Sequence, residues 1–116
     1  MSEALTFEDM GGTGHTDIIR MRGRLDARTS PLLMERCAGA RDAGHNLVLS
    51  MAEVSFLSSS GIGSLLAMTE EFREHGGCLS LAAISPTVRE AIELLNLEEF
   101  LTLYDSEDDA VRAQAA

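Results

Sequence analysis

The 116-residue sequence contains no lysine and no tryptophan, and its nine arginines are outnumbered by 19 aspartates and glutamates. Its formal net charge is therefore −10. Nucleic-acid binding depends on Lys and Arg contacts that release counterions from phosphates, so this charge excludes nucleic acid as a partner class. An anionic membrane surface is disfavoured for the same electrostatic reason. The acidity suits solubility and a basic protein partner instead.

Cysteines, aromatic residues and long apolar runs are also scarce. Cys37 and Cys78 lie far apart and form no Cys-x-x-Cys pair, which favours reduced thiols in a cytosolic protein over a disulfide framework. Aromatic residues make up only 4% of the chain, so its core must be aliphatic. No apolar run is long enough to span a bilayer, and the acidic start MSEALTFEDMGG lacks the apolar region of a signal peptide. We therefore expect a cytoplasmic protein.

The length and composition suit one globular unit. A chain of 116 residues with 45% hydrophobic residues can bury enough surface for one independent core. We expect a single domain over residues 1–116, in which residues 1–14 form a short N-terminal strand or an extension.

The first half of the sequence predicts two strands and a helix between them. HTDIIRMRG alternates apolar and polar residues as a strand does, and Gly23 allows a turn after it. A helix is predicted from a cap at Ser30 and a proline at position 31 to a stop at Gly44. NLVLSM and VSFL together predict one buried strand, bulged or bent near Ala52 and Glu53.

The second half continues the alternation of helices and strands. Helical spacing of apolar residues runs from position 60 to 75, and Gly76-Gly77 ends it. CLSLAAI and FLTLY predict strands, and the two remaining helices begin with Ser85-Pro86 and with a capping box of Ser106 and Asp109. The whole pattern predicts an α/β fold, with a mixed or mostly parallel sheet of about four to five strands and helices packed on it.

The stretch VSFLSSSGIGSLL, residues 54–66, places three consecutive serines between a strand and a helix. One serine suffices to cap a helix. The loops at the carboxyl ends of strands are the usual functional sites of such folds, and a helix N-terminus accommodates an anion or a phosphate. The two additional hydroxyls therefore mark this turn as the candidate site.

Other kinds of site fit the sequence poorly. SSSGIG lacks the Gly-x-Ser-x-Gly elbow of hydrolases, and Gly61-x-Gly63 is shorter than a dinucleotide fingerprint or a P-loop, whose lysine is absent. His15, His45 and His75 have no metal-ligand spacing. We expect no catalytic residue, no metal and no cofactor.

Three blocks of the sequence resemble, in order and spacing, those of a STAS domain of the anti-sigma-factor antagonist type: GRLDARTSPLL, NLVLSMAEVSFLSSSGIGSLL and HGGCLSLAAISPTVREAIELLNLEEFLTLYDSEDDAV. The resemblance extends from about Ile18 to the C-terminus. Its most specific motif, Val-x-Phe-x-x-Ser-Ser-Gly-x-Gly, is matched by Val54, Phe56, Ser59, Ser60, Gly61 and Gly63. The Gly-x-Leu-Asp motif is matched by Gly23, Leu25 and Asp26.

The resemblance implies a protein-binding switch. The first serine of Ser-Ser-Gly, here Ser59, would accept a phosphate from an anti-sigma factor that is also a serine kinase, with Ser58 and Ser60 as alternative acceptors. The unphosphorylated protein would bind the anti-sigma factor and free the sigma factor, and the phosphorylated protein would not bind. The implied partner surface comprises Asp26, Ser58, Ser60, Gly61, Ile62 and Gly63, and a weak homodimer is left open.

Two residues depart from the family pattern. Ser58 stands where the family usually has an aspartate before the phosphorylated serine, and Ser50 stands where it usually has an aspartate in the preceding strand. The alternative interpretation is a STAS protein-binding module, in a signalling scaffold or a transport complex, whose serines are not modified. A gene for a serine-kinase anti-sigma factor beside this one would favour the first interpretation.

Overall fold

The computed structural model describes residues 5–115. In chain order, its elements are β1 (Thr6–Thr13), β2 (Thr16–Leu25), α1 (Ser30–Asp42), β3 (Asn46–Leu57), α2 (Ser59–Glu74), β4 (Leu79–Ala82), α3 (Pro86–Leu94), the short 3-10 helix η1 (Glu98–Phe100), β5 (Leu103–Tyr104) and α4 (Glu107–Ala115).

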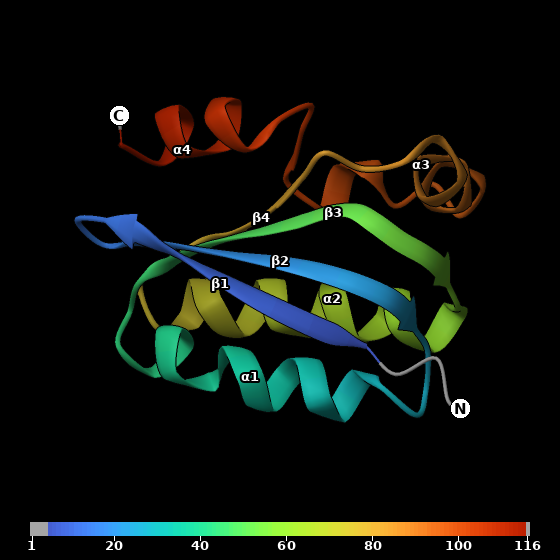
Figure 1. The fold of residues 1–116 in the computed structure, drawn as a ribbon, viewed down its shortest axis with the longest axis horizontal. Coiled ribbons are helices and arrows are strands. Elements are labelled where there is room, and N and C mark those ends of the chain that lie inside the picture. Colours follow the sequence, from blue (N-terminus) through green and yellow to red (C-terminus); the bar gives the residue numbers. More distant parts are fainter. Residues whose placement is uncertain (1–4, 116) are drawn as a thin grey trace.

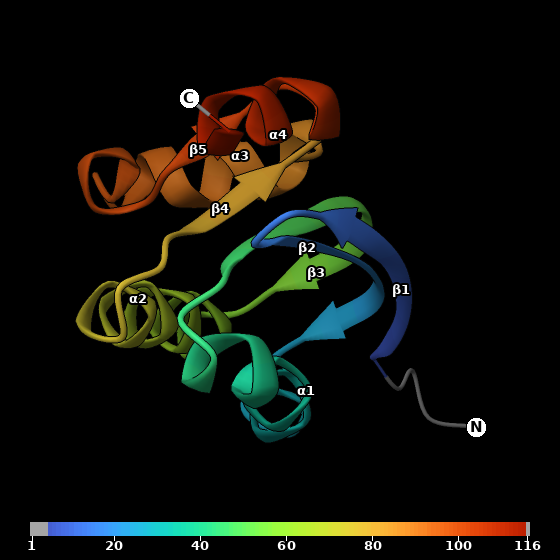
Figure 2. The same ribbon diagram turned by 90° about the vertical axis from the view of Figure 1, so that its left-hand side faces the viewer.

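The five strands form one sheet in the order β1-β2-β3-β4-β5. The β1–β2 hairpin is antiparallel, and the other three pairs are parallel. Helices α1 and α2 lie on one side of the sheet and α4 on the other, as Figures 1 and 2 show from two directions. The predicted α/β fold with a mostly parallel sheet is confirmed.

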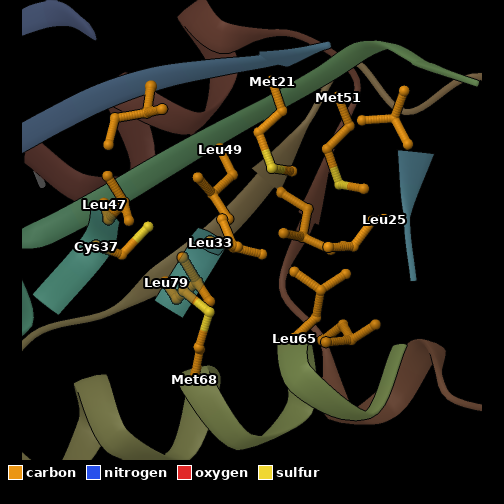
Figure 3. Packing of buried hydrophobic residues seen from close by; sticks show 14 of the residues in the cluster. Met21, Leu25, Leu33, Cys37, Leu47, Leu49, Met51, Leu65, Met68 and Leu79 are labelled. Carbon is orange, nitrogen blue, oxygen red and sulfur yellow. The ribbon is translucent and has the colours of Figure 1, made fainter. Parts of the chain in front are cut away.

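The core between the sheet and helices α1 and α2 is aliphatic, as the scarcity of aromatic residues predicts. Figure 3 shows Met21, Leu47, Leu49 and Met51 of the sheet facing Met68 and other side chains of the two helices. Phe72 is the one aromatic residue among the largest fully buried side chains. Both cysteines are free thiols. Burial of Cys37 in this core raises the pKa of its thiol to about 12, so it behaves as a small apolar side chain.

Strand β3 is bulged where the sequence predicts it. Arg20 pairs with Ser50 and Arg22 with Glu53, so two residues of β3, Met51 and Ala52, lie opposite one residue of β2. The predicted turn at Gly23 is wrong, because Gly23 lies inside β2 with a φ of 117° beside a second shift in register. Glycine at this position allows β2 to stay paired with the bulged strand β3 instead of ending there.

Three other predicted details are corrected. Thr29, rather than Ser30, precedes α1, and the Ser30 hydroxyl donates instead to the Asp26 carbonyl at 2.7 Å. The predicted strand FLTLY is shortened to Leu103–Tyr104, since Phe100 closes η1. Within residues 5–115, we find no helix with both the length and the hydropathy needed to cross a bilayer.

An ion pair links α4 to the face of the sheet opposite to α1 and α2. Arg20 of β2 donates two hydrogen bonds to Glu107, at 2.8 and 3.1 Å, while Ala110 packs against Val48 and Ala82. The bond from Arg20 lowers the pKa of the Glu107 carboxyl, and this effect exceeds the rise caused by partial burial. Glu107 thus stabilises the fold mainly in its charged form.

This pair predicts a pH-dependent loss of stability. A carboxyl whose pKa is lowered by folding stabilises the protein above its unfolded pKa, near 4.3, and that stabilisation disappears as the pH falls through the folded pKa. We expect Glu107→Gln to lower the free energy of unfolding by about 1 kcal/mol at pH 7, and the difference from wild type to shrink as the pH falls below the unfolded pKa and through the lowered folded pKa. Urea titrations between pH 3 and 7 measure it.

The neighbouring carboxylate of Asp108, exposed and in no ion pair within residues 5–115, provides the control. Asp108→Asn should have a smaller effect, because it changes only the charge at the start of α4. Identical stability curves for wild type and Glu107→Gln across this pH range would contradict the prediction.

Candidate functional site

The serine run forms the start of α2 directly after β3, and Ser58 is its cap. The Ser58 hydroxyl accepts a hydrogen bond from the Gly61 N–H at 3.1 Å, and the Ser58 N–H donates to the Leu25 carbonyl at 3.0 Å. Ser58 therefore satisfies one helix N–H and also ties the turn to the end of β2. The capping role accounts for one of the three serines.

Ser59 and Ser60 have no such structural task. Both are exposed, and neither hydroxyl bonds to another group within residues 5–115. As the first two residues of α2, they also have backbone N–H groups without acceptors in the helix. The first turn of α2 contains no acidic residue. The turn thus presents a free hydroxyl where helix dipole and N–H groups favour an added negative charge.

The two glycines of the motif differ in their surroundings. A β-carbon on Gly61 would lie 2.5 Å from the Leu25 carbonyl oxygen, so only glycine lets α2 pack this closely against the end of β2. A β-carbon on Gly63 would have no other atom within 4 Å among the described residues. Gly61 therefore serves internal packing, whereas Gly63 leaves an open strip of helix surface that another protein can approach.

Ile62 does not face solvent. Its side chain is only 3% exposed, and the neighbouring Ser64 is buried with its hydroxyl bonded to the Gly61 carbonyl. The side chain of Ile62 therefore points into the protein in this structure, and the implied place of this residue in a partner surface stays a prediction. The exposed residues of the turn are Ser59, Ser60 and Gly63, and Ser58 is half-buried.

Asp26 lies beside the serine turn, one residue beyond Leu25, but much of its carboxylate is already used. One oxygen, Oδ1, accepts hydrogen bonds from the N–H groups of Arg28 at 3.0 Å and Thr29 at 3.2 Å. Partial burial raises the pKa of this carboxyl. The hydrogen bonds together lower it by more, so the pKa lies below its usual value. Asp26 shapes the β2–α1 loop as a charged group and keeps its second oxygen toward Arg24, at 3.9 Å.

Arg24 and Phe56 form a contact beside the serine turn that was not predicted from the sequence. The Arg24 guanidinium carbon lies 4.0 Å from the centre of the Phe56 ring, an arrangement typical of cation–π contacts. The two residues are paired in the β2–β3 register immediately before Leu25 and Leu57. Phe56 belongs to the recognised motif, but its partner could be found only from the register of two bulged strands.

The histidines lie elsewhere. His15 and His45 precede β2 and β3, at the end of the sheet opposite to the serine turn, and the His45 Nδ1 lies 3.1 Å from Asp17. Among the residues that the structure describes, no group of three His, Cys, Asp or Glu side chains is arranged to hold a metal ion. The candidate site is therefore the start of α2 with its neighbours from β2 and β3.

The capping role of Ser58 gives a direct test of the first departure from the family pattern. Aspartate caps helices as well as serine does, so the substitution preserves the cap. We expect Ser58→Ala to cost about 1 kcal/mol of unfolding free energy, and Ser58→Asp to remain within about 0.5 kcal/mol of wild type. Guanidinium denaturation measures both. An aspartate variant as unstable as the alanine variant would contradict this role.

Comparison with known proteins gives consistent similarities. Residues 9–110 match the family model described as the STAS domain. The chain is 29% identical over 97 residues to the anti-sigma F factor antagonist of Paenibacillus polymyxa, covering 81% of this chain and 82% of that protein. An anti-sigma factor antagonist from Mycobacterium paratuberculosis is 25% identical, with a TM-score of 0.86 over 100% of this chain and 98% of that one. The anti-sigma factor antagonist SpoIIAA in its unphosphorylated form is also 25% identical, with a TM-score of 0.77 over 96% and 98%.

Proposed function

Because the chain belongs to the STAS domain family, we propose that it acts as an anti-sigma-factor antagonist, which binds an anti-sigma factor with serine-kinase activity and loses that binding when Ser59 is phosphorylated. The names of its relatives support the general role. The observation that carries the switch is the free, exposed hydroxyl of Ser59 at the start of α2.

The chemistry at Ser59 is a phosphoryl transfer that the partner catalyses. The γ-phosphoryl group of ATP moves to the Ser59 Oγ, the hydroxyl proton passes to a base of the kinase, and ADP leaves. This chain contributes the acceptor and its placement, and it needs no catalytic group. Ser58, fixed by its bonds to Gly61 and Leu25, is a poorer acceptor because its hydroxyl is engaged in the helix cap.

Phosphate at this position would alter the partner surface more than the fold. It adds about −1.5 to −2 charges beside the unpaired N–H groups at the start of α2, where a negative charge is tolerated. A partner that packs against Ser59, Ser60 and Gly63 would instead meet added bulk, a strongly hydrated group and charge repulsion from any nearby carboxylate. Binding is lost while the domain stays folded.

The test uses a purified anti-sigma factor with a serine-kinase domain, encoded beside this gene, together with ATP. We expect mass spectrometry to find one phosphate on the peptide containing Ser59, and calorimetry to find binding only with the unphosphorylated protein. Binding without phosphate on any serine would replace the switch by the unmodified binding module. Neither binding nor phosphate would reject the proposed function.

A further inference from the structure

The three most exposed of the large apolar side chains described lie close together in sequence. Leu94 is 77% exposed, Leu95 50% and Phe100 62%. Leu94 closes α3, Leu95 caps it and Phe100 closes η1. Exposed apolar side chains gathered on one segment are typical of a surface that contacts another protein. We call this segment, residues 94–100, the α3–η1 patch.

The local structure explains why these side chains cannot turn inward. Helix α3 buries Val88 and Ile92, one turn apart, in the main core, and this leaves Leu94 and Leu95 beyond the buried face. Asn96 then reverses the chain with a φ of 56°, and Leu101 enters the core after η1. With both ends of the segment fixed by buried residues, Phe100 remains outside.

The charges around the patch are of one sign and are not neutralised within the described chain. Glu90, Glu93, Glu98 and Glu99 are all exposed, and none forms an ion pair within residues 5–115. The only cation of residues 86–100 is Arg89, and it lies 3.5 Å from Asp105. By contrast, seven of the nine arginines are paired with carboxylates: Arg20, Arg22, Arg24, Arg41, Arg73, Arg89 and Arg112. The patch is an apolar centre with an uncompensated acidic rim.

The patch belongs to a helix that begins at the same end of the sheet as the serine turn. Strands β3 and β4 are parallel, so α2 and α3, which follow them, begin at the same end of the sheet, on the right in Figure 1. Helix α3 also packs against β3. The molecule measures 28 × 23 Å across its long axis, and an ordinary interface buries about 800 Å² on each partner. Helix α3 has nine residues and is about 14 Å long, so the patch at its far end stays within the reach of one partner of ordinary size that contacts the serine turn.

We propose that the α3–η1 patch is a second docking surface for the same anti-sigma factor, and that it accepts a segment with apolar side chains flanked by Arg or Lys. This proposal rests on the proposed function. Charge complementarity selects a basic segment, because the acidic rim repels another acidic surface. A second copy of this chain would bring two sets of four unpaired glutamates together across a symmetric interface, which disfavours a homodimer here.

The two surfaces have different tasks. The serine turn carries the phosphate and sets whether the complex forms, whereas the patch supplies apolar contact area that a phosphate on Ser59 does not change. The patch therefore contributes to affinity in the unphosphorylated state and helps the kinase to hold its substrate.

The test compares wild type, Leu94→Ser/Phe100→Ser and a control, Leu32→Ser, by calorimetry with the purified anti-sigma factor. Leu32 is 46% exposed on α1, so the control removes a similar side chain outside the patch. We expect the patch variant to bind about tenfold more weakly and the control to stay within about twofold of wild type. A Glu93→Gln/Glu98→Gln variant should bind with a weaker dependence on salt. Thermal melts verify that all variants are folded.

The possible failures are distinguishable. Equal affinity of wild type and the patch variant would overturn this inference and leave the proposed function intact. If the wild type does not bind the anti-sigma factor, the proposed function and the inference fall together. Sedimentation that finds wild-type dimers, abolished by Leu94→Ser/Phe100→Ser, would make the patch a homodimer interface and overturn the proposal.

Discussion

We expect replacement of Ser59 by alanine to abolish phosphate transfer from the proposed anti-sigma kinase, and Ser58→Ala and Ser60→Ala only to reduce it. The structure separates Ser59 from Ser58: Ser59 is exposed with an unbonded hydroxyl, while the Ser58 hydroxyl is bonded to the Gly61 N–H at 3.1 Å. The register of the Ser-Ser-Gly motif separates Ser59 from the equally exposed Ser60. Labelling with radioactive ATP, followed by mass spectrometry of the tryptic peptides, measures the extent and the position of the phosphate.

Ser60→Ala is the matched control, because Ser60 is equally exposed and lies in the same helical turn. The Ser60→Ala variant loses one exposed hydroxyl but keeps Ser59, the proposed phosphate acceptor. Label that persists in Ser59→Ala and disappears in Ser60→Ala would move the acceptor by one residue. The register of the motif would then be wrong.

We expect replacement of Gly61 by alanine to lower the free energy of unfolding by about 2 kcal/mol, and the melting temperature by about 8 °C. The added β-carbon would lie 2.5 Å from the backbone oxygen of Leu25, which cannot move aside without shifting the end of β2. Calorimetric or circular-dichroism melts measure the change. Because α2 and β2 must separate to accommodate the methyl group, the variant should also bind its partner more weakly.

Gly63→Ala is the control for this substitution. It adds the same methyl group to the same helix, but into open space, so the gain in helix propensity should raise stability by about 0.5 kcal/mol. If Gly61→Ala lowers the free energy of unfolding and Gly63→Ala raises it, the loss at Gly61 is due to the close contact with Leu25 and not to a change in helix propensity. Equal destabilisation would show that the close contact at Gly61 is not what limits the position.

Periodicity predicted the order of the elements well because most of them bury one regular face. The alternation around Ile19 and Met21 and the helical spacing from Ile62 to Phe72 correspond to buried residues of β2 and α2. The errors lie where a local pattern has two structural solutions. Gly23 is compatible with a turn or with an irregular strand, and only the bulges of the neighbouring β3 decide for the strand.

The candidate site could be located from the sequence, but its division of tasks could not. Three equal serines gave no sign of which one caps α2, because the choice depends on the bond between Ser58 and Leu25 of another strand. Ile62 and Gly63 are adjacent in the motif, yet one side chain is buried and the other position is open. Neighbouring residues of a helix point in different directions around its axis, so Ile62 faces the core and Gly63 faces outward.

The α3–η1 patch had a weak signal in the sequence. In EAIELLNLEEFL, apolar residues are more numerous than one helical face can bury, and the glutamates are interspersed among them. Which leucines remain outside depends on the point at which α3 ends. That point is fixed by Asn96, whose positive φ is accessible to asparagine more readily than to most residues.

A partner encounters the first turn of α2 already in its final shape, because the contacts of Ser58 and Gly61 with Leu25 hold it in place. This turn does not have to become ordered before a complex forms, so we expect diffusion and long-range electrostatic attraction to set the association rate. A phosphate adds about −2 to a net charge of −10, which alters that attraction only slightly. We therefore expect the proposed switch to act mainly on the lifetime of the complex, with a phosphorylated protein that associates nearly as fast as the unmodified one and dissociates much sooner.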